Sequence, residues 1–152
     1  MDRQKRKTGE DAAKNVTPRV RIKELRTVRV GDLVPNPENW RTHPDEQRRA
    51  FNAAIERVGI ADAPKVWESP DGLMILDGHL RAEELDDDAE IPVQVLDVDE
   101  DEARFLLATY DPMAMLAQAD KEATAALLEQ LDASSDLEAL VAEMEKAALL
   151  FE

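Results

Sequence analysis

The spacing of apolar residues predicts a helix in the first half of the chain. Between residues 51 and 58 they recur at i, i+3, i+4 and i+7, which places them on one helical face. Pro44 is typical of a first helical turn, and Gly59 is typical of the residue that ends a helix. We therefore predict a helix over about residues 44–58. Its apolar stripe consists of Phe51, Ala54, Ile55 and Val58.

Short β-type segments surround this helix. Ser69–Gly72 has the composition of a tight turn and separates two of these segments, which predicts a hairpin. The strands are expected at residues 26–30, 64–68, 73–76 and 91–96.

The C-terminal third has helical periodicity. A helix is expected from the acidic run at residues 99–102 to Asp111-Pro112, where proline should break it. Two more helices are expected over about residues 121–131 and 135–150. One face of the last carries Leu137, Leu140, Val141, Met144, Ala148 and Phe151. This face either packs on its own domain or contacts a second copy or another protein, so a homodimer is one expectation.

Composition narrows the chemistry. The 152 residues suffice for one small domain with tails, and they include no cysteine. Disulfides, thiolate metal sites and cysteine nucleophiles are therefore excluded. No run approaches the roughly 18 apolar residues of a membrane span, and the basic N-terminus lacks the apolar core of a signal peptide. We expect a cytoplasmic protein that does not contact a membrane.

Charge is distributed unevenly along the chain. Residues 1–30 carry a net +6, whereas the remainder carries −21. An acidic body repels a phosphate backbone, so we expect no direct DNA binding except through the N-terminal tail. Residues 1–18 are polar without periodicity, which predicts a disordered basic tail. That tail either contacts nucleic acid or an acidic partner, or is simply solvated.

The segment Asp77–Arg81 joins the predicted strand at 73–76 to a short helix over about residues 80–85. A strand that turns at Gly78 into a helix presents unpaired N–H groups, which suit a phosphate. His79 and Arg81 add donors, and the arginine fork matches phosphate oxygens. The alternative is structural: Gly78 permits a turn, and Arg81 pairs with a carboxylate.

A second motif lies upstream in Val34–Pro44, which reads VPNPENWRTHP. A Pro-Asn-Pro…Arg segment followed by a helix, a hairpin and an Asp-Gly-His-x-Arg box resembles the ParB N-terminal-like superfamily. That superfamily includes sulfiredoxin and is often labelled "ParB-like nuclease". The resemblance covers roughly residues 28–111. It is strongest to the branch associated with DNA methyltransferases, phages and mobile elements.

The resemblance implies an α+β fold, a small mixed sheet flanked by helices, with C-terminal helices added. It divides the chain into a tail (1–18), a ParB-like domain (19–111) and a helical extension (112–152). It also implies binding of a nucleoside triphosphate, CTP or ATP, through the glycine–arginine box. The residues expected there are Asn39, Arg41, His43, Gly78, His79 and Arg81.

Several features depart from the family or leave alternatives open. The region after the last strand, Ala108–Pro112, lacks the family's Glu-Asn-Leu-Gln-Arg-like box, and too little chain follows for a helix-turn-helix domain. His43 could instead be a capping or packing residue, and His79 a buried structural one. Mg²⁺ is expected with the phosphates through Asp77. The acidic run Asp86–Asp88 lacks the spacing of a calcium loop and reads as solvated, and no carboxylate cluster indicates a two-metal nuclease.

Three functions follow as hypotheses. The first is a nucleotide-binding accessory module whose protein partner is a DNA methyltransferase or a phage protein. The second is an enzyme, a nucleotide hydrolase or phosphotransferase, for which Glu83 and Glu84 are the carboxylates near the box. The third is an acidic protein-interaction module in which the glycine box is structural. Cysteine-based sulfiredoxin chemistry is excluded.

Overall fold

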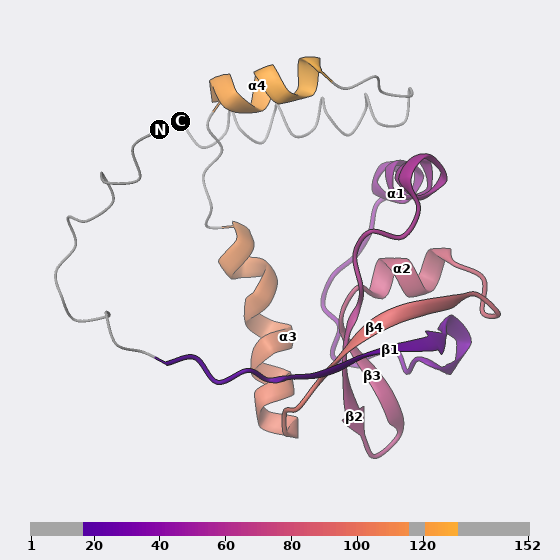
Figure 1. The fold of residues 1–152 in the computed structure, drawn as a ribbon, viewed down its shortest axis with the longest axis vertical. Coiled ribbons are helices and arrows are strands. Elements are labelled where there is room, and N and C mark those ends of the chain that lie inside the picture. The colour runs from indigo at the N-terminus through magenta and orange to yellow at the C-terminus, as the bar shows by residue number, and fades with distance from the viewer. Residues whose placement is uncertain (1–16, 116–120, 131–152) are drawn as a thin grey trace, which may run out of the picture.

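The computed structural model describes residues 17–115 and 121–130 (Figure 1). This part of the chain contains both helices and strands. They are β1 (Ile22–Arg29), the 3₁₀ turn η1 (Val30–Asp32), α1 (Asp45–Val58), β2 (Lys65–Ser69), β3 (Gly72–Asp77), α2 (His79–Glu84), β4 (Glu90–Leu96), α3 (Glu100–Met115) and α4 (Lys121–Glu129). Within the described ranges, none of the helices has the length and apolar character that a membrane crossing requires.

The four strands form one mixed sheet in the order β1-β4-β2-β3. β1 and β4 pair antiparallel, as do the hairpin strands β2 and β3, whereas β2 and β4 run parallel. The parallel pairing requires a crossover between the hairpin and β4, and α2 lies in that crossover. The predicted α+β class, a small mixed sheet with flanking helices, is confirmed.

Both faces of the sheet are covered. On one face Val66, Ile75, Val93 and their neighbours form a buried cluster beneath α2. On the other, Trp67, Leu76 and Leu96 pack against Ala103 and Leu107 of α3. The alternation of β4, in which Ile91, Val93 and Val95 face one cluster and Leu96 the other, serves both layers. Burying each such aliphatic side chain is worth about 1.5–3 kcal/mol.

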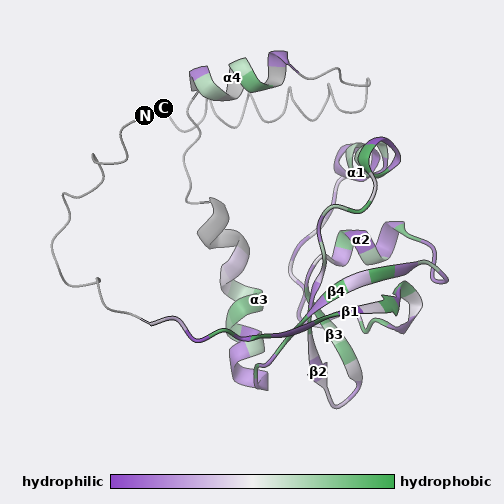
Figure 2. Cartoon of the chain, viewed as in Figure 1, coloured by the Kyte–Doolittle hydropathy of each residue, from purple (hydrophilic) through white to green (hydrophobic). Residues whose placement is uncertain are grey.

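The start of α3 is fixed by its acidic residues. The backbone N–H of Glu102 donates to Asp99 Oδ1 at 2.8 Å, and the N–H of Asp99 donates back to Glu102 Oε1 at 3.2 Å. This is a reciprocal capping box. Arg21 donates to both oxygens of Glu102, at 2.5 and 2.9 Å, and so ties the residues before β1 to α3. The hydrogen bonds from Arg21 and from the backbone N–H of Asp99 lower the pKa of the Glu102 carboxyl to about 2. Figure 2 shows these first turns as hydrophilic and the middle of α3 as hydrophobic.

The strands and helices expected within the described residues are present, but two boundaries differ. The strand expected at 26–30 is Ile22–Arg29, with Val30 in the 3₁₀ turn that follows. The helix begun at Glu100 does not end at Asp111-Pro112 but continues to Met115. Proline removes only the helical hydrogen bond to residue 108, and a helix that is already propagated can accept that loss with a bend. The apolar stripe of α1 lies largely outside the core, since Val58 is 72% exposed and Ala50 alone in this helix is fully buried. The reason is that α1 lies over α2 rather than over the sheet (Figure 1).

Other expectations are only partly addressed by the structure. The helix expected over 121–131 is present as α4. The helix expected over 135–150, with its apolar face, lies outside the described residues, as do residues 1–16 of the predicted basic tail. The division of the chain into tail, domain and extension stays a prediction.

Candidate functional site

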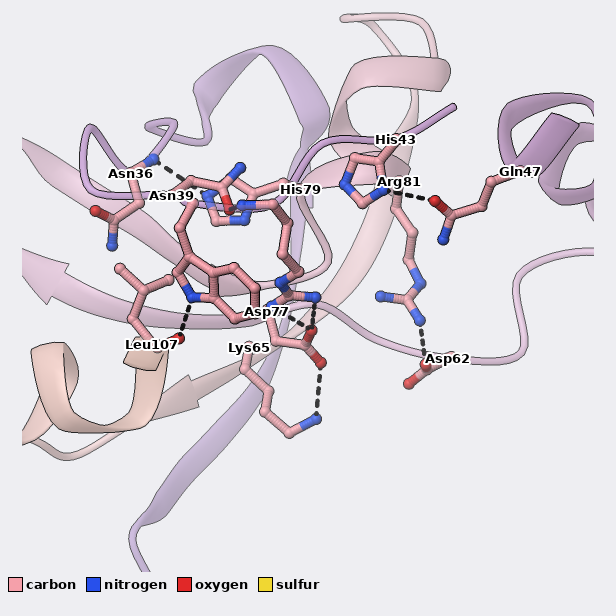
Figure 3. A network of polar contacts seen from close by, with 12 residues as sticks. Asn36, Asn39, His43, Gln47, Asp62, Lys65, Asp77, His79, Arg81 and Leu107 are labelled. Carbon is pink, nitrogen blue, oxygen red and sulfur yellow. Dashed lines mark hydrogen bonds and ion pairs between the residues drawn. The ribbon is translucent and has the colours of Figure 1, made fainter. Parts of the chain in front are cut away.

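The residues nominated from sequence meet at a small cavity between the start of α1 and the turn from β3 to α2. Its volume is about 240 Å³. Figure 3 shows the polar network around it. The lining residues are Arg41, His43, Gln47, Phe51, Asp77, Gly78, His79, Leu80 and Arg81. Of the six nominated nucleotide-binding residues, five are therefore brought together with Asp77. Asn39 is not among the lining residues.

Gly78 is required by both conformation and space. Its φ of 104° and ψ of 23° lie in the left-handed region, which side chains with a Cβ rarely adopt. A Cβ at this position would come within 2.9 Å of Pro64 Cβ and 2.8 Å of Arg81 Nη1. The turn thus lets the Arg81 side chain pass directly over the backbone. α2 has only six residues, so we attribute the positive character of the site chiefly to its side chains.

His79 is the buried polar group of the site, with 5% of its surface exposed. Its Nε2 accepts a hydrogen bond from the backbone N–H of Asn36 at 3.3 Å, which fixes the ring against the Pro-rich loop. Accepting at Nε2 leaves the proton of the neutral ring on Nδ1, and this buried atom has no hydrogen-bond partner among the described residues. Burial, and then the charge of Arg41, lower the pKa of His79. The site therefore holds a neutral imidazole with an unused N–H donor.

Arg41 lies at the floor of the cavity beside Asp77. Its two terminal nitrogens donate to Asp77 Oδ1 at 3.3 and 3.2 Å, and Lys65 Nζ lies 3.5 Å from Asp77 Oδ2. Burial works to raise the pKa of Asp77, but the charges of Lys65 and Arg41 outweigh it and hold that pKa below its ordinary value. Asp77 is consequently an ionised carboxylate between two cations.

Arg81 also has a carboxylate partner. Its Nη2 pairs with Asp62 Oδ2, from the segment between α1 and β2 (Figure 3). This pairing agrees with the structural alternative for Arg81. The two arginine pairs differ in exposure, because Asp62 is 64% exposed whereas Asp77 is 25% exposed.

The remaining nominated residues organise the loop before α1. Asn39 Oδ1 accepts the backbone N–H of Arg41 at 3.3 Å, so its side chain stabilises the turn that presents Arg41. His43 Nδ1 lies 2.9 Å from Gln47 Oε1, one turn into α1. The helix start itself has no side-chain cap. The side chains of Asn39 and His43 thus already make hydrogen bonds within this loop and the first turn of α1.

The two glutamates that follow the box serve α1. Arg48 pairs with Glu84 and, at 2.8 Å, with Glu83, while Asn52 Nδ2 donates to Glu84 at 3.0 Å. The hydrogen bond from Asn52, followed by that from Arg48, lowers the pKa of Glu84. These contacts join α1 to α2. They also occupy the two carboxylates, one of which would have to act as the catalytic base if the chain were an enzyme.

Sequence reasoning missed three contributors. Asp62, in the segment before β2, pairs with Arg81. Lys65, the first residue of β2, lies close to Asp77. No local sequence pattern marks either residue. Trp40 was overlooked as an anchor: its Nε1 donates to the carbonyl of Leu107 at 3.1 Å, and its ring lies 6.0 Å from the Arg41 guanidinium. A large aromatic residue directly before Arg41 in a loop was a signal that could have identified it.

The site does not fit a metal centre built from protein ligands. Both oxygens of Asp77 already face cations, at Arg41 and Lys65. Among the described residues, no group of three or more histidines and carboxylates is arranged to hold a metal ion. The expectation of Mg²⁺ at Asp77 stays a prediction that this arrangement disfavours.

A larger cavity of about 560 Å³ lies elsewhere, between the start of β1 and α3. Its lining is mostly apolar and includes Ile22, Phe105 and Tyr110. None of the nominated residues reaches it. We therefore place the candidate site at the smaller cavity.

No protein-family model matches the chain. No curated protein matches it either. Solved structures do match. The C-terminally truncated chromosome-partitioning protein ParB from Caulobacter crescentus complexed with CTP-γ-S is similar with a TM-score of 0.51 and 19% identity, over 64% of this chain and 55% of that one.

A second structure of C-terminally truncated ParB from Caulobacter crescentus, complexed to the centromeric parS site, gives a TM-score of 0.43 at 19% identity. It matches over 61% of this chain and 51% of that one. The chain thus spans about half the length of the ParB chains it matches. The first similarity, together with the observed sheet and its helices, shows that this chain has a ParB-like fold.

Proposed function

We propose that this chain is a ParB-like module that binds a nucleoside triphosphate at the cavity between α1 and the β3–α2 turn. The observation that carries this proposal is the convergence of Arg41, Arg81 and His79 on one cavity. Guanidinium forks are donors suited to phosphate oxygens. A structure of similar fold was solved with CTP-γ-S, which supports the same ligand class here.

The dimensions indicate which part of the ligand would be enclosed. A volume of about 240 Å³ lies below the roughly 300–1,000 Å³ of pockets that enclose whole drug-sized ligands. It suits phosphate groups. The nucleoside would then lie at the mouth of the cavity, beside the first turns of α1, where Gln47 and Phe51 are located. Mg²⁺, where it accompanies the phosphates, would be held mainly by them.

The proposed role is that of an accessory module in a DNA-modification, phage or mobile-element context, with a DNA methyltransferase or a phage protein as partner. The resemblance of the two sequence boxes to that branch supports this role. The net charge of −21 on residues 31–152 argues against direct DNA contact by the body. The pairing of Glu83 and Glu84 with Arg48 favours binding over hydrolysis or phosphoryl transfer.

The test is calorimetry with CTP, ATP and GTP in the presence of Mg²⁺. Arg81→Ala should weaken triphosphate binding about ten- to a hundredfold, because a charge-assisted contact is worth roughly 1.5–3 kcal/mol. Arg104→Ala is the matched control: it removes the same charge from α3, where Arg104 pairs with Glu38. Wild-type protein that gives no heat with any of the three at millimolar concentration would refute the proposal.

One observation favours the acidic interaction module instead. Both arginines of the site already have carboxylate partners, Asp77 and Asp62, as a purely structural site would. Thermal stability separates the two functions, because a ligand that binds only the folded state raises the melting temperature. A melting temperature unchanged by every nucleotide would favour the interaction module.

A further inference from the structure

The two carboxylates on the site's arginines are held very differently. Asp77 belongs to the floor of the cavity: it ends β3, is 25% exposed and faces both Arg41 and Lys65. Asp62 belongs to the segment between α1 and β2, is 64% exposed, and is drawn in Figure 3 with Arg81 as its partner. The Asp77 carboxylate is held between two cations, whereas the exposed Asp62 carboxylate can leave Arg81 without disturbing buried contacts.

Asp62 therefore occupies one terminal nitrogen of Arg81, a residue that lines the cavity. The Arg81 side chain is only 20% exposed and passes over Gly78, so its direction is fixed by the turn. A carboxylate and a phosphate can each present two oxygens to a guanidinium fork. A ligand phosphate that binds through this fork competes with Asp62.

We propose that Asp62 is an internal competitor that sets the affinity of this site for polyanions. Without ligand its carboxylate occupies Arg81; a ligand phosphate displaces it and takes its place. This inference rests on the proposed function. It adds a determinant that neither sequence box contains, 19 residues before the arginine it controls.

Exposed ion pairs exchange readily, because water and salt compete with them. After displacement, the Asp62 carboxylate stays close to the incoming negative charge and repels it. Removing that charge should consequently relieve both the competition and the repulsion. The effect on affinity should be large relative to the effect on folding.

The experiment titrates inorganic triphosphate and CTP into the full chain, with EDTA present to exclude metal, at about 0.15 M salt. At that ionic strength charges more than about 8 Å apart are largely screened. Asp62→Asn should lower the dissociation constant at least threefold. Asp71→Asn is the matched control: it removes the same charge from the β2–β3 turn, where Asp71 lines a different cavity with Glu38 and Arg104, and it should leave binding unchanged.

A double variant distinguishes competition for Arg81 from general repulsion. In the Arg81→Ala background, Asp62→Asn should have a much smaller effect, because the group for which they compete is gone. Wild type that binds while Asp62→Asn binds equally or more weakly overturns this inference and leaves the proposed function standing. Absence of binding by wild type and Asp62→Asn alike at millimolar ligand, both in EDTA and with Mg²⁺, overturns both.

Discussion

Helices α3 and α1 are attached to the domain in opposite ways. α3 inserts Ala103 and Leu107 into the cluster around Trp67 and Leu76, with Leu107 only 3% exposed. α1 instead lies over α2 through ionic and polar contacts of Arg48, and leaves Val58 largely in solvent. One helix is part of the core, and the other rests on charged side chains.

This difference explains where the site lies. Apolar packing is strong and is not weakened by charge screening, whereas exposed ion pairs are weak and rearrange easily. The cavity opens between α1 and α2, on the polar side of the molecule. Binding sites are commonly drawn from such regions of lower local stability, because they can adjust to a ligand while the sheet stays fixed. Truncating an apolar side chain in each helix, and weakening the ionic contacts of α1, test the comparison.

The largest effect should come from truncating the core helix. Leu107→Ala removes a buried side chain that packs with Trp67 and Leu76, so the free energy of unfolding should fall by about 2–5 kcal/mol. Denaturant titration measures it.

Val58→Ala is the counterpart in α1. Because Val58 is exposed, its truncation should change the free energy of unfolding by no more than about 0.5 kcal/mol. A loss at Val58 that matches the loss at Leu107 would show that α1 is packed by apolar contacts after all.

Local signals explain why much of the fold was predictable. Gly59 and Gly78 both adopt positive φ at the helix boundary where the sequence placed them, and Ser69–Gly72 closes the β2–β3 hairpin. Each depends on residues only a few positions apart. The continuation of α3 through Pro112 was not predictable in the same way, because a local breaker was outweighed by the helix already formed before it.

The site was predictable in its members but not in its pairing. The two boxes nominated five residues that line the cavity together with Asp77. Their partners come from far along the chain: Arg41 reaches Asp77 across 36 positions, and Lys65 joins from β2. Similarly, the apolar spacing in α1 predicted a helix but did not predict the surface on which that helix packs. Only the folded topology determines which carboxylate meets which arginine.

A second prediction uses pH to examine the buried imidazole. The pKa of His79 is lowered in the fold by burial and by Arg41, so between pH 7.5 and 5.5 the unfolded chain binds more protons than the native state. The free energy of unfolding should therefore fall as pH drops below about 6.5. Protonation at Nε2 would also break the hydrogen bond from the Asn36 N–H.

Matched variants assign this dependence. His43→Gln should retain it, because the burial of His79 and the charge of Arg41 beside it remain, whereas His79→Gln should flatten it. The pH titration of the His79 ring by NMR gives the same answer without a substitution at that position. An ordinary or raised pKa for His79 would contradict the assignment of a neutral, buried donor.

The smallest effect should appear at the polar attachment of α1. Arg48→Gln removes the cation that joins Glu83 and Glu84, and the side chain is about one-third exposed, so global stability should fall only slightly. Hydrogen exchange should detect the change more clearly: amides of α1 should exchange faster while amides of α3 do not. Raising salt should produce the same pattern in the wild type, because screening weakens the same contacts. If α1 and α3 respond equally to Arg48→Gln and to salt, the two helices are not attached differently, and the contrast between an ionic and an apolar side of this domain fails.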